Sequence, residues 1–187
     1  MADSGITKKA LAGALKKLME EMPFSKISVG DICERCDMNR KSFYYHFKDK
    51  YDLVNWIFDT EFMEVVGETE CLRGWEFFRK LCEYLYDHHD FYRRALKIDG
   101  QNTFREHFRE ILHAFSSAEL QKIFFDETVD DFYIHFITDG FVCAMERWIT
   151  ERDCVSPDVF LQKIETIMKK IAVRVYSRIE ENSENSL

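Results

Sequence analysis

Apolar residues recur at intervals of three and four along most of the chain, which is the spacing of amphipathic α-helices. In the first clear stretch, residues 8–22, Leu11, Leu15 and Leu18 share one face, and Pro23 favours a helix end just before it. Because this helical spacing continues along the chain, the pattern predicts an all-α fold of about nine helices. The other eight are expected at 28–35, 40–46, 50–66, 74–88, 90–98, 103–122, 126–150 and 157–180.

Composition agrees with a helical protein. Only 2 Pro and 7 Gly occur among 187 residues, and these two residue types disfavour helix interiors most. No run of about 18 apolar residues occurs, so we expect no membrane-spanning helix, and residues 1–13 lack the apolar core of a signal peptide. The expected location is the cytoplasm, where the 6 Cys would be reduced thiols.

Charge is distributed unevenly along the chain, whose net charge is −8. Residues 1–58 carry 10 Lys and Arg against 8 Asp and Glu, whereas the rest carries 16 against 26. A slightly basic head on an acidic body is typical of a small DNA-binding domain carried by a larger domain. We therefore expect a DNA-binding domain at 1–50 and a helical body at 51–187.

Residues 28–47 contain two short predicted helices joined by a four-residue turn and preceded by a longer helix, the arrangement of a helix-turn-helix. Ser28 lies three residues before Asp31, which predicts a capping box. Asn39 is a favourable N-cap for the second short helix. In the turn between them, Asp37 tolerates left-handed backbone angles better than most residues.

The second short helix is rich in side chains of the kinds that contact DNA. Phe43 and Phe47 are its expected buried anchors, and most of its other residues can donate hydrogen bonds to phosphates and base edges. We expect Arg40, Lys41 and Tyr45 to contact bases. The alternative from composition alone is a solvated basic face. The expected DNA contacts, with Tyr44, His46 and Lys50 assigned to phosphates, are Thr7, Ser28, Asn39, Arg40, Lys41, Ser42, Tyr44, Tyr45, His46, Lys48 and Lys50.

Residues 27–53 resemble the DNA-binding segment of TetR-family regulators, and the resemblance extends over 7–58. That family typically has an aromatic-Tyr-x-His-Phe ending followed by x-x-Lys-x-x-Leu. This chain departs from it at Cys36 and Asp37, where small Ala and Gly are usual, and at Lys41, where a small residue is frequent. The family motif is matched by Phe43, Tyr44, His46, Phe47, Lys50 and Leu53.

The body resembles the family in architecture, as helices of a ligand-binding and dimerisation domain. Residues 141–148, which follow Gly140, are similar to the C-terminal domain of regulators related to dihydroxyacetone-kinase control. The resemblance implies a homodimer formed by helices near 126–150 and 157–179, a pseudo-palindromic operator, and repression relieved by a small-molecule effector. Aromatic residues of the body are candidates for the effector pocket or simply for the core: Tyr84, Phe104, Phe108 and Trp148.

Other chemistries have weaker support. Cys33 and Cys36 have the spacing of a metal or redox pair, but a structural zinc site needs four ligands and the pair falls on the expected buried face. The histidines are expected at the surface or in the core.

No Gly-rich phosphate loop or nucleophile elbow occurs, so we expect neither an enzyme nor a cofactor. The remaining alternative is a co-regulator that keeps the helix-turn-helix scaffold but acts by protein–protein interaction.

Overall fold

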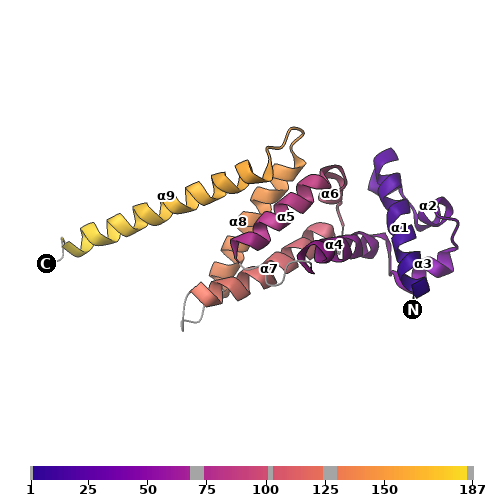
Figure 1. The fold of residues 1–187 in the computed structure, drawn as a ribbon, viewed down its shortest axis with the longest axis horizontal. Coiled ribbons are helices and arrows are strands. Elements are labelled where there is room, and N and C mark those ends of the chain that lie inside the picture. The colour runs from indigo at the N-terminus through magenta and orange to yellow at the C-terminus, as the bar shows by residue number, and fades with distance from the viewer. Residues whose placement is uncertain (1, 68–73, 101–102, 124–129, 185–187) are drawn as a thin grey trace.

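A computed structural model describes residues 2–67, 74–100, 103–123 and 130–184, and its regular elements are all helical (Figure 1). The nine predicted α-helices are present. The sequence did not predict the short 3-10 helix η1, Phe24–Lys26. The α-helices are α1 Ala2–Glu21, α2 Val29–Arg35, α3 Arg40–His46, α4 Lys50–Gly67, α5 Trp75–Asp87, α6 His89–Ala95, α7 Phe104–Ile123, α8 Asp131–Thr150 and α9 Pro157–Glu184.

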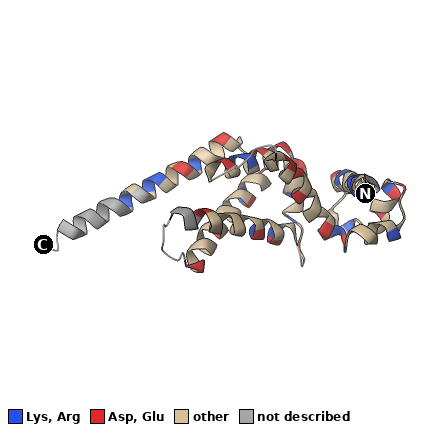
Figure 2. Cartoon of the chain, turned by 60° about the horizontal axis from the view of Figure 1, so that its bottom comes forward, with Lys and Arg blue, Asp and Glu red and all other residues tan. Residues whose placement is uncertain are grey.

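The first three helices pack together as a head at one end of the molecule (Figure 1). Their apolar faces meet around Leu11, Leu15, Ile32 and Phe43, each of which is fully buried. Helix α1 begins at Ala2, well before the predicted start near residue 8, so Thr7 lies inside the helix and does not cap it. Figure 2 shows basic and acidic positions mixed along the helices of the head.

Helix α4 connects the head to the body. Near its start Trp56 contacts Phe47 of the head, with ring centroids 5.6 Å apart. Two residues further on, Phe58 is fully buried and packs against rings of the body. A single continuous helix therefore packs against both head and body, whose buried residues form one hydrophobic cluster.

The body is a helical bundle in which α7 and α8 run side by side and α5 and α6 cover them (Figure 1). Helix α7 begins with a capping box: the Thr103 amide donates to Glu106 Oε2 at 2.9 Å, and the Glu106 amide donates to Thr103 Oγ1 at 3.4 Å. Among the described residues, no helix is both long and apolar enough to cross a bilayer.

Helix α9 leaves the body after its first turns. Phe160 and Leu161 are buried, and Phe160 stacks on Trp148 of α8 with ring centroids 4.6 Å apart. Beyond Ile164 the helix projects away from the bundle (Figure 1). It continues to Glu184, beyond the predicted end at residue 180.

Candidate DNA-binding surface

The helix-turn-helix is held by the local hydrogen bonds that the sequence predicted. Ser28 and Asp31 form a capping box: Ser28 Oγ accepts from the Asp31 amide at 3.2 Å, and the Ser28 amide donates to Asp31 Oδ2 at 2.7 Å. The hydrogen bond from the Ser28 backbone lowers the pKa of Asp31. In the turn, Asp37 has φ +55°, the left-handed conformation that its position required. The Ser28 amide and hydroxyl oxygen are thus engaged within the head.

Asn39 is the N-cap of helix α3, and its Oδ1 accepts from the Ser42 amide at 2.8 Å. The Ser42 hydroxyl donates to the same oxygen at 3.3 Å. Phe43 and Phe47 are the buried anchors, as predicted, with 0% and 3% of their surface exposed. Together the cap and the anchors fix a helix of only two turns, which would not be stable alone.

The remaining residues of α3 form an exposed face. Tyr44 and Tyr45 expose 59% and 83% of their surface, and Lys41 and Lys48 are also exposed. His46 is half-buried, with its ring 4.9 Å from that of Tyr45. We name Arg40, Lys41, Tyr44, Tyr45, His46 and Lys48 the recognition surface.

Arg40 of this surface lies against helix α2. An ideal Cβ built on Gly30 would stand 2.5 Å from Arg40 Nη2, so the guanidinium occupies the space that a side chain at position 30 would need. Gly30 is a residue that sequence reasoning missed. The sequence did contain a sign of it, because a glycine inside a short helix weakens that helix and usually marks a place where another group packs closely.

Lys50 differs from the rest of the predicted set. Its ammonium donates to the carbonyls of Phe24 and Ile27, both at 2.7 Å, and lies 4.3 Å from the centre of the Phe24 ring. Burial lowers its pKa, and the nearby Asp31 opposes this shift. Two of its three donor hydrogens therefore bind η1 to the start of α4, and at most one remains for a phosphate.

The four candidate pocket residues of the body are buried and separate into two groups. Tyr84, Phe104 and Phe108 surround Phe58, with ring centroids 6.1, 5.3 and 5.7 Å from it. Trp148 belongs instead to the contact with α9 and donates from Nε1 to the Val155 carbonyl at 2.7 Å. None of the four lines any of the cavities found at the end of α1, beside α4, beside α6 or along α9. In this conformation these rings fill the core.

A buried polar network that the sequence did not reveal joins four helices. The Tyr84 hydroxyl lies 2.7 Å from the Tyr92 hydroxyl and donates to Glu61 Oε2 at 3.0 Å. Glu61 also binds the Lys16 ammonium, at 2.5 and 2.7 Å. Burial is the main cause that raises the pKa of both tyrosines. The network ties the head, through α1, to α4, α5 and α6.

Among the described residues, the cysteines and histidines form no metal site. Cys33 is buried, and Cys36 Sγ donates to the Ile32 carbonyl at 3.2 Å. Burial raises the pKa of both thiols, which disfavours the thiolate that a metal requires. In the part of the chain that the structure describes, no three His, Cys, Asp or Glu side chains gather as metal ligands.

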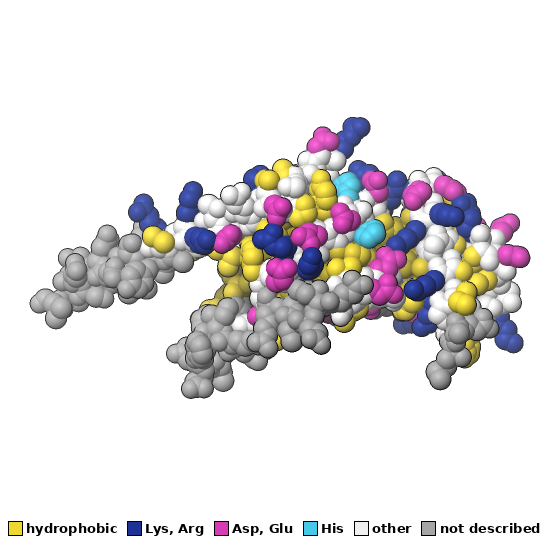
Figure 3. All heavy atoms as spheres, viewed as in Figure 1, with side chains coloured by type: hydrophobic (Ala, Val, Ile, Leu, Met, Phe, Trp, Pro, Cys, Tyr) yellow, Lys and Arg dark blue, Asp and Glu magenta, His cyan; other side chains and the backbone are white. Residues whose placement is uncertain are grey.

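At the other end of the molecule, α8 and α9 expose large apolar side chains. Figure 3 shows hydrophobic side chains gathered on the body beside the projecting α9. Such a concentration is unusual for a surface that only water contacts. We name the following the C-terminal apolar surface: Phe132, Tyr133, Phe136 and Ile137 of α8, and Ile167, Met168, Ile171 and Val173 of α9.

Two family models match the chain. Residues 11–57 match the model described as bacterial regulatory proteins, tetR family. Residues 75–170 match the model of a transcriptional regulator C-terminal region. The first match covers most of the head and the beginning of α4, and the second covers the body with the beginning of α9.

Individual known proteins that resemble the chain are also transcriptional regulators. The chain is 32% identical over 145 residues, 76% of its own length and 74% of the relative, to the HTH-type dhaKLM operon transcriptional activator DhaS of Lactococcus lactis subsp. lactis (strain IL1403). Two solved structures share the fold. One, a dihydroxyacetone kinase operon activator DhaS, has a TM-score of 0.65 at 23% identity, with 90% of this chain and 97% of that chain covered. The other, a TetR transcriptional regulator from Streptococcus agalactiae 2603V, has a TM-score of 0.69 at 21% identity, with 89% and 95% covered.

Proposed function

This chain belongs to the TetR family of transcriptional regulators, and on that premise we propose that helix α3 enters the major groove of an operator. Members of this family bind operator DNA and are not enzymes. The observation that carries the proposal is the recognition surface, in which exposed hydroxyl and cationic groups project from a helix held by Asn39, Phe43 and Phe47. Such groups contact phosphates and base edges.

The division of labour within the recognition surface follows from exposure. Tyr45, at 83% exposed, and Lys41, which is also exposed, are the residues assigned to bases. Arg40 extends over Gly30, and it can reach a guanine only by swinging its flexible guanidinium off α2. Tyr44 and Lys48 are assigned to phosphates.

The protein is proposed to bind its operator as a homodimer through the C-terminal apolar surface. Covering exposed aromatic and aliphatic side chains with a second copy removes them from water at a gain of about 25 cal/mol per Å². A two-fold symmetric dimer presents two α3 helices, which matches a pseudo-palindromic operator with half-sites one helical turn apart.

The sense of regulation is proposed to be activation under the control of an effector. The resemblance seen in the sequence implied repression relieved by a small molecule. However, the Lactococcus lactis relative, at 32% identity, is named an operon activator, and this specific relative outweighs the general tendency of the family. Deleting the gene and measuring transcripts of the neighbouring operon tests the sense: a fall is expected, and a rise would mean repression.

A mobility-shift assay with the DNA flanking the protein's own gene tests the binding proposal. The double variant Arg40→Ala/Tyr44→Ala should weaken binding by about 100-fold, since each lost contact costs about 1–3 kcal/mol. Lys163→Ala, which removes an exposed cation from α9, is the matched control and should leave binding unchanged. Undiminished binding by the double variant would sink the assignment and favour a co-regulator that acts through protein contacts.

A further inference from the structure

A cavity of about 540 Å³ lies at the junction of head and body. Its walls on the head side come from the end of α1, from η1 and from Tyr51 at the start of α4. On the body side they come from residues 94–99, which include the end of α6 and the residues after it. Its volume falls within the range of about 300–1,000 Å³ typical of small-molecule sites.

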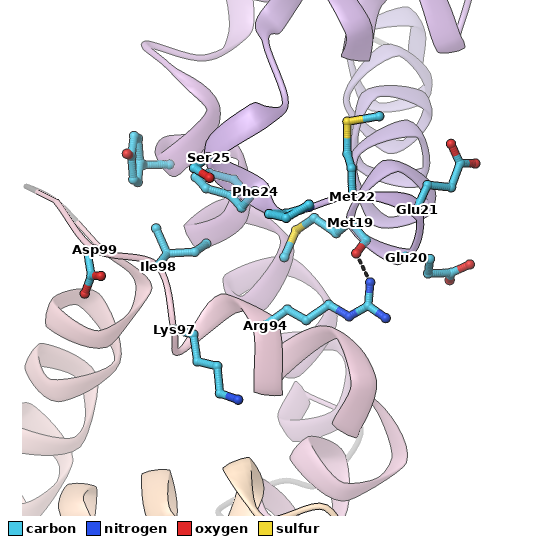
Figure 4. A pocket seen from close by; sticks show the side chains of 12 residues that line it. Met19, Glu20, Glu21, Met22, Phe24, Ser25, Arg94, Lys97, Ile98 and Asp99 are labelled. Carbon is cyan, nitrogen blue, oxygen red and sulfur yellow. Dashed lines mark hydrogen bonds between the residues drawn. The ribbon is translucent and has the colours of Figure 1, made fainter.

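The centre of this junction cavity is apolar. Met19, Phe24 and Ile98 converge on it from three different elements (Figure 4). They leave at most 8% of their surface to solvent. An apolar group of a ligand would therefore meet hydrocarbon on both the head side and the body side.

Two cations of the body stand at the cavity. The Arg94 guanidinium donates to the carbonyl of Met19 at the end of α1, a hydrogen bond drawn in Figure 4. Lys97 is exposed and has no ion-pair partner among the described residues. Arg94 belongs to α6, and Lys97 follows the end of that helix.

The acidic residues at the cavity do not cancel these cations. Glu21 is bound by the Arg35 guanidinium through two hydrogen bonds of 2.6 Å each. Figure 4 shows Glu20 and Glu21 directed away from the apolar centre, and Asp99 at the other end of the cavity from Arg94. Arg94 and Lys97 are thus the two groups of the lining that could bind an acid group of a ligand.

We propose that the junction cavity is the effector site and that it binds a small organic acid with an apolar body. The apolar body lies between Met19, Phe24 and Ile98, and the acid group lies at Arg94 and Lys97. This inference rests on the proposed effector control and relocates the site from the aromatic core, where Tyr84, Phe104 and Phe108 already fill the space.

Binding here would act directly on the attachment of the head. An anionic oxygen forms a stronger hydrogen bond with a guanidinium than a neutral carbonyl does, so the ligand competes with Met19 for Arg94. Because the ligand touches both head and body, its affinity depends on how the two are placed. If operator binding changes the affinity for the ligand by some factor, the bound ligand must change the affinity for the operator by the same factor.

Two fluorescent probes that differ by one acid group test the chemistry of the site. The first is 8-anilino-1-naphthalenesulfonate, and the second is N-phenyl-1-naphthylamine, which lacks the sulfonate. The full-length protein should bind one sulfonate probe per chain saturably, and the uncharged probe more weakly. Equal affinity for both, or no saturable binding of the sulfonate, would overturn the proposal.

Three variants locate the bound probe. Ser25→Trp places a large ring in the cavity from an exposed position of η1 and should abolish saturable binding. Lys97→Gln should weaken the sulfonate by about fivefold, as expected for a partly exposed ion pair, and leave the uncharged probe unaffected. Lys26→Gln removes an exposed cation next to Ser25 that does not line the cavity and should change neither affinity.

A probe that binds elsewhere is recognised by the same variants. A probe on the C-terminal apolar surface would bind Ser25→Trp as well as it binds the parent chain, and this result would overturn the proposal. Thermal melting of each variant verifies that it is folded. Mobility shifts of the parent chain without probe test DNA binding separately, so the proposed function can stand while the junction site fails.

Discussion

The recognition surface and the C-terminal apolar surface both expose aromatic rings, but the rings have different neighbours. Tyr44 and Tyr45, 59% and 83% exposed, carry hydroxyls and stand beside Lys41. Phe132 and Phe136, 68% and 70% exposed, carry no polar atom, and their ring centroids are 6.2 Å apart. Exposure alone therefore does not identify a partner.

The chemistry around each exposed ring separates the two cases. A ring that ends in a hydroxyl among cations can keep its polar tip hydrated or place it on a phosphate. A stripe of hydrocarbon has no such option and gains only when another apolar surface covers it. One end of the molecule is thus suited to nucleic acid and the other to a second copy of the chain.

Introducing a charge at either end should have the largest effects and should affect different assays. Phe136→Asp is expected to weaken dimerisation by at least about 1,000-fold, because two buried Phe side chains are lost per dimer at about 1.5–3 kcal/mol each and a carboxylate is desolvated. Sedimentation velocity at micromolar concentration should show monomers.

Tyr45→Asp is the matched variant at the other end. It places the same carboxylate on an exposed aromatic position, so the dimer should persist while DNA binding is lost through repulsion from the phosphates. If Phe136→Asp stayed dimeric, or if Tyr45→Asp dissociated, the two surfaces would not have the separate roles that we assign to them.

The salt dependence of DNA binding should identify the cations that reach phosphates. Lys48→Ala is expected to reduce the slope of log affinity against log salt by about 1 and to weaken binding by roughly tenfold at low salt. Lys50→Ala serves as a contrast, because its ammonium is held by the carbonyls of Phe24 and Ile27. Lys50→Ala should lower thermal stability more than Lys48→Ala does and should change the slope less. The opposite ranking of the two variants would contradict the assignment of Lys48 to a phosphate.

The head could be predicted more fully than the body, and the reason is physical. Ser28 and Asn39 each cap a residue three positions away, and Asp37 acts through its own backbone angle, so the local sequence is enough to predict these roles. Whether Tyr84 lines a pocket or fills the core depends on side chains from other helices, and periodicity reports only that one face is buried. The junction cavity has no local signature at all, since residues 19–25 and 94–99 meet only in the fold.

Removing the N-cap of α3 and that of α8 should have smaller effects, which differ between the two helices. Asn39→Ala removes the acceptor of the Ser42 amide and should destabilise the protein by about 1 kcal/mol. Because α3 has only seven residues, DNA binding should weaken as well. Asp130→Ala removes the equivalent acceptor of the Phe132 amide at α8, a helix of 20 residues, and should leave DNA binding unchanged. Urea denaturation and mobility shifts measure both effects, and an equal loss of DNA binding in the two variants would contradict the prediction.

Between the two surfaces, an ion pair joins α4 to α7 and should make the smallest contribution. His107 Nε2 lies 2.6 Å from Asp59 Oδ1, and this hydrogen bond raises the pKa of His107 above its usual 6.5. The protonated imidazole is thus favoured in the folded state, so its stabilisation is fully present below pH 6.5 and is lost as the pH rises through the raised value. The effect should be about 0.2–1 kcal/mol, as for other partly exposed pairs.

Comparing the parent chain with His107→Gln isolates this contribution. The difference in urea midpoint should be largest in mildly acidic buffer and should shrink as the pH is raised towards 9. His135→Gln is the control, because His135 Nδ1 hydrogen-bonds the backbone carbonyl of Asp131 and no carboxylate. A difference that grew with pH would mean that the neutral imidazole is the form that the fold prefers, and the His107–Asp59 pair would then not stabilise the link between head and body.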